Sequence, residues 1–62
     1  MTWFKLRDFG GGTYTTKVFR GGKSRQVSLQ LGEVYEEDDA DIATILRADP
    51  NLMECDENGT PV

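Results

Sequence analysis

Hydrophobic and polar residues alternate in the middle of the chain. Val27, Leu29 and Leu31 are separated by single polar residues, which is the period of a strand with one buried face. Gly32 interrupts the alternation, and a short apolar pair follows at 34–35. We therefore predict a strand, a kink or tight turn at Gly32, and a short second strand. Glycine suits that turn because it tolerates backbone angles that other residues avoid.

The pattern changes to a helical period after the short second strand. Ile42, Ile45 and Leu46 recur at the i, i+3, i+4 spacing that places apolar side chains on one face of a helix. The Asp-Pro-Asn sequence at 49–51 ends this helix, because the residue before a proline is driven towards extended geometry. We predict a helix of about nine to eleven residues that depends on packing for its stability. Residues 52–57 alternate again and predict a closing strand.

A run of carboxylates at 36–39 precedes the predicted helix. Asp38 or Asp39 is the expected N-cap, because a side-chain carboxylate accepts hydrogen bonds from the free backbone N–H groups of the first turn. The other carboxylates then lie near the positive end of the helix dipole. A calcium loop also needs a glycine at its sixth position, and none occurs there counted from either aspartate. The run therefore predicts a helix cap and no metal site.

Residues 13–20 are rich in β-branched and aromatic side chains, which favour strands. The Gly-Gly-Lys-Ser sequence at 21–24 is typical of a tight turn between two strands. We therefore predict a hairpin over 13–31. Within its first strand, Val18 and Phe19 point to opposite faces.

Residues 2–9 predict a strand or an extended arm, with Phe4 and Leu6 on one face and Trp3 on the other. Trp3 has two interpretations that stay open: it covers an edge of the core, or it anchors a partner. The three glycines at 10–12 predict a flexible joint. They lack the Lys-Ser/Thr sequence and the following helix of a phosphate-binding loop.

The charges are divided unevenly between the two halves of the chain. The net charge is −4, but residues 1–31 contain six basic side chains against one acidic, and residues 32–62 contain one basic against ten acidic. One interpretation is that the two halves attract each other within one small domain. The other is a bipolar surface that joins copies head to tail or docks on a charged partner.

The length and the residue types limit the chemistry. A chain of 62 residues forms one domain at most, and it is marginally stable unless a disulfide, a metal or a partner supports it. Cys55 is the only cysteine and there is no histidine. These counts exclude an intrachain disulfide, a structural zinc site, and a Cys-His or Ser-His nucleophile. We therefore expect no enzymatic activity and no cofactor, and oligomerisation or docking on a larger assembly becomes the expected support.

The remaining sequence features concern location and the thiol. The N-terminus has no signal-peptide pattern, and no apolar run approaches the roughly 18 residues that a membrane span needs. A single thiol without a disulfide framework fits an intracellular origin. Cys55 is expected to be a buried or half-exposed inert thiol, since no histidine is present to activate it.

Residues 17–57 resemble a known group of proteins. The segment reads KVFRGGKSRQVSLQLGEVYEEDDADIATILRADPNLMECDE. It combines a strand, a Gly-Glu-Val-Tyr-Glu turn into a strand, an acidic cap before a helix, a proline after that helix and a final acidic strand. This order is similar to that of the small accessory proteins encoded among the virion structural genes of tailed bacteriophages. The resemblance implies a β-rich module with one helix that serves as a capsid or tail accessory in the virion, assembled in the host cytoplasm.

Together, the two periodicities predict an α+β fold. We expect a small antiparallel β-sheet or SH3-like open barrel of about three to five strands, with one short helix before the last strand. The chain divides into an N-terminal arm and glycine joint at 1–12, a β-rich module at 13–57 and a loose tail at 58–62. The expected core consists of Phe4, Leu6, Tyr14, Val18, Val27, Leu29, Leu31, Val34, Ile42, Ile45, Leu46 and Leu52.

The expected function is that of a non-enzymatic virion structural or accessory protein of a tailed phage. Its partner is itself or a capsid or tail protein, so the chain is expected to be a homo-oligomer or bound to the particle, with no membrane contact. The residues expected to bind the partner are Trp3, Phe4, Phe19, Arg20, Lys23 and Arg25. The turn cations among them also have a simpler role, since charges protect an exposed strand edge.

Two alternative functions stay open. The first is an intracellular protein-binding module, such as a small phage protein that inhibits a host factor through its acidic face. The second is a nucleic-acid-binding barrel that uses Lys17, Arg20, Lys23 and Arg25. The second is less favoured, because the acidic half of the chain repels a long polyanion.

Overall fold

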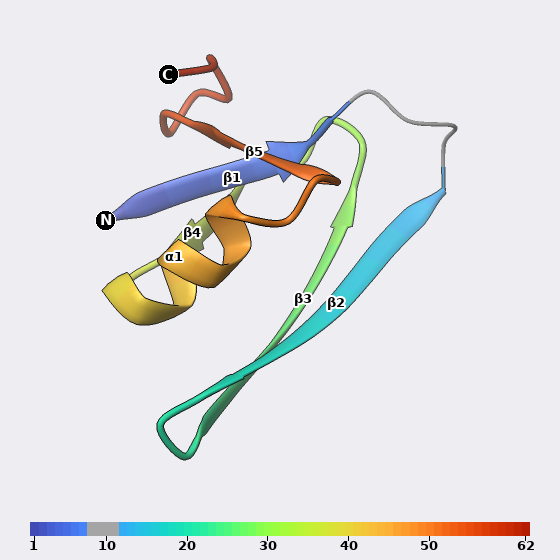
Figure 1. The fold of residues 1–62 in the computed structure, drawn as a ribbon. Coiled ribbons are helices and arrows are strands. Elements are labelled where there is room, and N and C mark those ends of the chain that lie inside the picture. The colour runs from blue at the N-terminus through green and yellow to red at the C-terminus, as the bar shows by residue number, and fades with distance from the viewer. Residues whose placement is uncertain (8–11) are drawn as a thin grey trace.

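Five strands and one helix form the described part of the chain, residues 1–7 and 12–62 of a computed structural model (Figure 1). In chain order they are β1 (Thr2–Leu6), β2 (Thr13–Arg20), β3 (Lys23–Gln30), β4 (Tyr35–Glu37), α1 (Ala40–Arg47) and β5 (Leu52–Cys55). An antiparallel three-stranded sheet has the order β4-β1-β5, and β2 and β3 form a separate antiparallel hairpin. The small α+β fold and the helix before the last strand are confirmed. In the described residues, the two sheets do not close into a barrel.

The hairpin follows the predicted turn chemistry. Arg20 lies opposite Lys23, so only Gly21 and Gly22 connect the two strands. These glycines have φ angles of 56° and 78°, which side-chain-bearing residues avoid. Two consecutive positive φ angles are the geometry that matches the twist of the flanking strands in a two-residue hairpin loop. The Gly-Gly pair therefore determines both the position of the turn and the register of the eight-residue strands.

The N-terminal strand β1 is the centre of the three-stranded sheet, so of the two predictions for the first residues, a strand or an extended arm, the strand is confirmed for Thr2–Leu6. Phe4 lies opposite Tyr35 of β4 on one side and Glu54 of β5 on the other. Its side chain is 0% exposed. Pairing on both edges supplies the backbone hydrogen bonds, and burial of the apolar face supplies the driving force. Of the predicted glycine joint, Gly12 is described with a φ of 86°, and the other two glycines lie outside the described residues.

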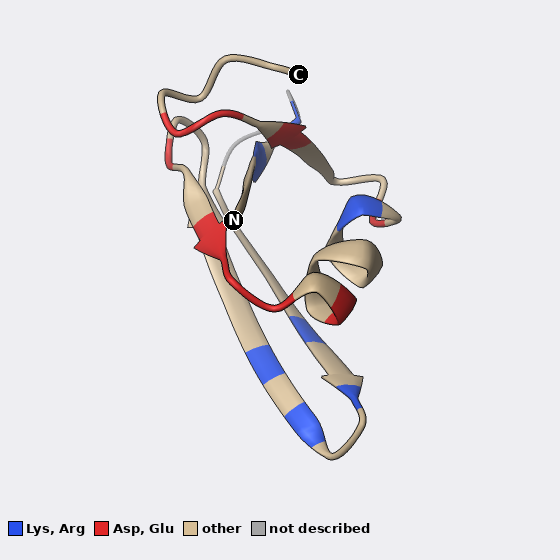
Figure 2. Cartoon of the chain, turned by 90° about the vertical axis from the view of Figure 1, so that its left-hand side faces the viewer, with Lys and Arg blue, Asp and Glu red and all other residues tan. Residues whose placement is uncertain are grey.

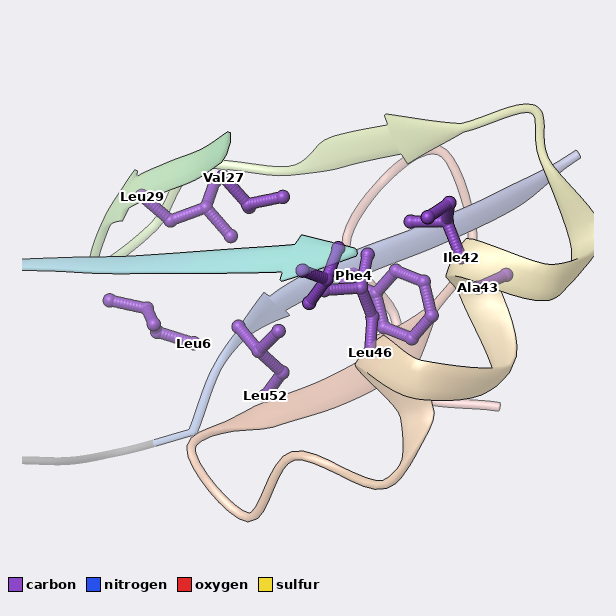
Figure 3. Packing of buried hydrophobic residues seen from close by; sticks show 9 residues of the cluster. Phe4, Leu6, Val27, Leu29, Ile42, Ala43, Leu46 and Leu52 are labelled. Carbon is purple, nitrogen blue, oxygen red and sulfur yellow. The ribbon is translucent and has the colours of Figure 1, made fainter. Parts of the chain in front are cut away.

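The core lies between the three-stranded sheet, α1 and the inner face of the hairpin (Figure 3). It consists of Phe4, Leu6, Val18, Val27, Leu29, Ile42, Ala43, Leu46 and Leu52. Tyr14, Tyr35 and Ile45 pack against this cluster and stay partly exposed. Val34, predicted to be in the core, is only half-buried. It lies instead against the C-terminal turn, where a Cβ at Gly59 would come within 3.3 Å of Val34 Cγ2.

Leu31 was predicted to be buried and is 54% exposed. The strand ends one residue earlier, at Gln30, and Gly32 has a φ of 93°. The backbone N–H of Glu33 donates to Gln30 O at 3.0 Å and closes the turn. Because the chain leaves the strand at this turn, the alternation that points Leu29 inward no longer applies to Leu31.

The C-terminal residues turn back onto β5, so the prediction of a loose tail at 58–62 is wrong. Asp56 Oδ1 accepts hydrogen bonds from the backbone N–H groups of Asn58 and Thr60, each at 2.9 Å. The backbone N–H of Asp56 donates to Thr60 O at 2.9 Å. A single aspartate therefore organises this turn, as aspartates do when they bond to backbone groups that follow them.

Both faces of β5 are covered. Leu52 lies opposite Leu6 and faces the core. Cys55 lies opposite Trp3 and therefore points to the other face of the sheet. There it is buried beside Pro61, which forms an isolated bridge with it. The predicted alternation of β5 is confirmed, and the returning tail pairs with the edge of β5 at Cys55.

The helix begins with the predicted cap. Asp39 is the N-cap, and its Oδ1 accepts from the backbone N–H groups of Asp41 at 2.9 Å and Ile42 at 3.1 Å. The helix has eight residues, slightly fewer than predicted. It ends before a compact turn in which Asp49 Oδ1 accepts from the backbone N–H of Asn51 at 2.9 Å. The Asp-Pro-Asn sequence therefore ends the helix as predicted.

Candidate protein-binding surface

The two ends of the hairpin have different surroundings. Near the open end, Val27 and Leu29 of β3 are buried in the core. Towards the turn, the hairpin extends past the start of α1 and away from β1 and β5 (Figure 1). We call this projecting end the hairpin tip, and it consists of Phe19, Arg20, Gly21, Gly22, Lys23 and Ser24. These residues line an open depression of about 370 Å³.

Phe19 is the large hydrophobic side chain of the hairpin tip, and 68% of it is exposed. It lies opposite Ser24, whose small polar side chain cannot cover the ring. Lys17 is its neighbour on the same face of β2, and Lys17 Nζ lies 5.7 Å from the centre of the ring. This distance is within the range of a cation–π interaction. The tip therefore presents an aromatic ring beside a cation to the solvent.

Two cations of β3 bond to acidic residues at the end of β4 and at the N-cap of α1. Lys23 Nζ lies 2.9 Å from Asp39 Oδ2, and Arg25 Nη2 lies 3.0 Å from Glu37 Oε2. Figure 2 shows this arrangement, with basic positions on the hairpin near its tip and an acidic stretch leading into the helix. The attraction between the two charged halves is therefore partly satisfied within the domain.

The cations of β2 differ from those of β3. Lys17 and Arg20 are exposed, and neither forms an ion pair within the described residues. Ion pairs between fully exposed groups contribute little to stability. Among the described residues, the positive charge that is not used in internal ion pairs therefore comes from Arg20 of the tip and from Lys17 beside it.

Glu37 is a buried acidic residue that the sequence did not predict. Its side chain is 2% exposed. Oε1 accepts from Tyr35 Oη at 2.7 Å, and Oε2 accepts from Arg25 Nη2 at 3.0 Å and from the backbone N–H of Asp39 at 3.1 Å. Three donors thus compensate the loss of water around this carboxylate. In the sequence, Glu37 follows Tyr35 by two residues, which places both side chains on the same face of a strand. This spacing was the available sequence signal for their contact.

The groups around Glu37 respond to its charge. Burial and the hydrogen bond to Glu37 raise the pKa of Tyr35 to about 12. The charge of Glu37 also raises the pKa of Arg25. Arg25 Nε is buried and has no hydrogen-bond partner within the described residues. The guanidinium of Arg25 therefore makes only some of its possible hydrogen bonds there. Glu37 therefore joins β3, β4 and the start of α1 at one point.

Asp39 connects the tip to the helix. Oδ1 caps the first turn, while Oδ2 accepts from Lys23 Nζ at 2.9 Å. The hydrogen bond from Lys23, together with the backbone N–H of Ile42, lowers the pKa of Asp39 to about 2. The same contact raises the pKa of Lys23. One carboxylate therefore acts as helix cap and as the acceptor that holds the first residue of β3.

Two predicted partner-binding residues lie away from the hairpin tip. Phe4 is in the centre of the core and cannot contact a partner, so that prediction is wrong. Trp3 is half-buried on the outer face of β1, opposite Cys55. This face is opposite to the one on which Phe4 and Leu6 enter the core, and both interpretations of Trp3, as cover for an edge of the core or as an anchor for a partner, stay predictions.

The other four predicted residues lie along the hairpin. Phe19 and Arg20 are exposed at the tip, and Lys23 is exposed but bonded to the helix cap. Arg25 is half-buried and bonded to a buried carboxylate. Lys17 was considered only for the nucleic-acid alternative, yet it lies beside Phe19. Lys17 comes two residues before Phe19, so alternation places both side chains on the same outward face of the strand. This spacing was the sequence signal for the contact between them.

The described residues give little support for a metal site, a membrane-spanning helix or a reactive thiol. Within residues 1–7 and 12–62, no group of three or more His, Cys, Asp or Glu side chains is placed to hold a metal ion. No helix in that part is long and apolar enough to cross a membrane. Cys55 is buried, as expected for one of its two predicted states, and burial raises the pKa of its thiol. Its reactive thiolate form is therefore disfavoured.

No protein-family model, no curated protein and no solved structure matches the chain. The resemblance to phage accessory proteins therefore stays a prediction. Function has to be inferred from the fold and from the surface that the hairpin presents.

Proposed function

We propose that the chain is a non-enzymatic structural or accessory protein of a tailed-phage virion, and that the hairpin tip binds a capsid protein, a tail protein or another copy of the chain. The observation that carries the proposal is the exposed Phe19 ring, flanked by Lys17 and Arg20, which form no ion pair with any residue that the structure describes. Aromatic and arginine side chains contribute most to the energy of protein interfaces. The sequence resemblance of residues 17–57 favours a virion as the setting.

The architecture supports this role because the tip is held in place. Val27 and Leu29 anchor one end of β3 in the core, and Lys23 and Arg25 bond to the segment before α1. A projecting segment that is already ordered loses less conformational entropy on binding than a flexible one. As a finer description of the fold, we propose an SH3-like open barrel, supported by two sheets around one core and a helix before the last strand.

The two alternatives differ in their support. Three acidic side chains are exposed, Glu36 in β4, Asp38 before the helix and Asp41 in the first turn of α1, and they support a protein-binding role for the acidic face. The nucleic-acid alternative is weaker, because two of its four cations, Lys23 and Arg25, already bond to carboxylates.

The test is the presence of the chain in purified particles of the phage that encodes it. Immunoblots should detect the unmodified chain, and Phe19→Ser should remove it from the particles while its circular dichroism spectrum stays unchanged. Leu31→Ser is the matched control, because Leu31 is another exposed apolar residue, 54% exposed, that lies outside the tip. This control should still enter particles.

Two results would contradict the proposal. One is absence of the unmodified chain from particles. The other is equal incorporation of the Phe19→Ser and Leu31→Ser variants, which would show that the hairpin tip is not the docking surface.

A further inference from the structure

The outer strand edges of the two sheets are protected to different extents. At β5, Pro61 bridges to Cys55 and covers the edge. At the end of β3, the N–H of Gln30 donates to Glu33 Oε1 at 2.7 Å. β4 is only three residues long. β2 and β3 each have eight residues and pair only with each other within the described part of the chain. They differ in their cations: Lys23 and Arg25 of β3 bond to Asp39 and Glu37, whereas Lys17 and Arg20 of β2 form no ion pair within the described residues. An unpaired edge of this length is a template for another strand.

The backbone groups of β2 alternate in direction. Arg20 and Lys23 flank a two-residue turn, so they form a pair that exchanges hydrogen bonds across the hairpin. The next residues, Phe19 and Ser24, then direct their N–H and C=O groups away from each other, and Lys17 repeats the position of Phe19. The side chains of Lys17 and Phe19 are exposed as well. This end of β2 therefore offers unpaired backbone groups and exposed side chains on the same residues.

Building on the proposed binding role of the tip, we infer that the free edge of β2 accepts an extended acidic segment of a partner protein as an added antiparallel strand. Strand addition obtains affinity from backbone hydrogen bonds and specificity from alternate side chains. Acidic residues opposite Lys17 and Arg20 supply the missing counter-charges, and an apolar residue opposite Phe19 covers the ring. Read from its N-terminus, the partner segment has the order acidic, apolar, any residue, acidic.

Charge argues against a second copy of β2 as the added strand. Antiparallel pairing of β2 with itself places two copies of Lys17 and Arg20 on one small sheet, and like charges on neighbouring strands are destabilising. Lysine in an edge strand is a common protection against such self-pairing. The same charges favour an acidic strand, so the edge of β2 selects a partner strand by the sign of its charge.

The test uses the full ¹⁵N-labelled chain and the synthetic peptide Thr-Glu-Val-Thr-Glu-Thr, blocked at both ends. The peptide should cause saturable NMR shifts along β2 and slow the exchange of the amides of Lys17 and Phe19. The amide of Gln26, which faces Lys17 across the hairpin, should exchange as before. The peptide Thr-Lys-Val-Thr-Lys-Thr should bind at least about tenfold more weakly, because its charges are reversed.

Two proline variants form a matched pair. Lys17→Pro removes an N–H that points away from β3 and should abolish peptide binding, whereas Gln26→Pro removes the equivalent N–H on the other edge and should not. Lys17→Gln keeps the backbone donor and should weaken binding several-fold. The exchange measurement on the unmodified chain decides the question even where a proline variant does not fold.

Several results would overturn the inference: no binding of the acidic peptide, equal binding of both peptides, or slowed exchange at Gln26 instead of Lys17. A dimeric free chain whose Lys17 and Phe19 amides are already protected would show that a second copy covers the edge. If the peptide experiments give one of these contradicting results while Phe19→Ser still removes the chain from particles, strand addition is wrong and the proposed function stands.

Discussion

Two of the three phenylalanines, Phe4 and Phe19, lie in regions of opposite character. Phe4 is on the central strand, paired on both sides, and 0% exposed. Phe19 is near the end of a strand with one neighbour and is 68% exposed. Hydrophobic burial therefore holds the body of the domain, whereas the tip is held by its turn and by side-chain contacts from β3 to the helix start. One chain thus contains a region that stabilises the fold and a region free to bind.

Replacing Phe4 or Phe19 with alanine should separate the two regions most strongly. Phe4→Ala should destabilise the domain by about 3–5 kcal/mol, since it leaves a cavity in a small core. This loss is comparable with the total stability of many domains, so the variant is expected to be largely unfolded. Phe19→Ala should change stability by no more than about 0.5 kcal/mol. Urea denaturation followed by circular dichroism measures both, and a large loss for Phe19→Ala would contradict the separation.

The second comparison concerns two adjacent glutamates. Glu37→Ala should cost about 1–3 kcal/mol, because Tyr35 and the backbone N–H of Asp39 then lose a buried acceptor. Glu36→Ala, at an exposed neighbouring position, should change stability by no more than about 0.5 kcal/mol. Urea denaturation of the two variants checks this. Equal effects would mean that the buried carboxylate does not connect the hairpin to the body.

A smaller, pH-dependent effect is expected at Asp39. Its folded pKa, about 2, is below the ordinary value of 3.8 because of Lys23 and the helix N–H groups. A depressed folded pKa contributes stability above the unfolded pKa, and this contribution is lost as the pH falls from about 3.8 to about 2. Asp39→Asn keeps a capping side chain and should reduce the dependence of stability on pH in this window. Melting curves measured between these pH values test it, and an unchanged pH dependence would exclude the ion pair as its cause.

The smallest expected effect is the ionisation of Tyr35. Burial and the bond to Glu37 raise its pKa to about 12, so the phenol should stay protonated well above the ordinary value of 10.0. Its contribution to stability is present below the unfolded pKa and is lost as the pH rises towards 12. Ultraviolet titration of the chain and of Tyr35→Phe isolates this phenol. The transition that is present in the unmodified chain and missing in Tyr35→Phe belongs to Tyr35. A midpoint near pH 10 for this transition would contradict the buried contact with Glu37.

Local patterns in the sequence were sufficient for the secondary structure. Gly21 and Gly22 supply the two positive φ angles of the turn, and Asp39 supplies the side-chain acceptor of the first helical turn. Each depends on residues close in the chain, so each was predictable. For the candidate surface, the outward direction of Phe19 followed from alternation, but the charges of Lys23 and Arg25 did not reveal that both are bonded internally.

Tertiary structure decided the features that depend on residues far apart in the chain. β1 became the central strand because Phe4 and Leu6 pair with β4 and β5, whereas the sequence of the first residues fits an arm equally well. Glu37 is buried because Arg25 of another strand reaches it. Periodicity along the chain determined which residues form strands and a helix; non-local packing and charge pairing determined which of them are buried, and which cations stay free.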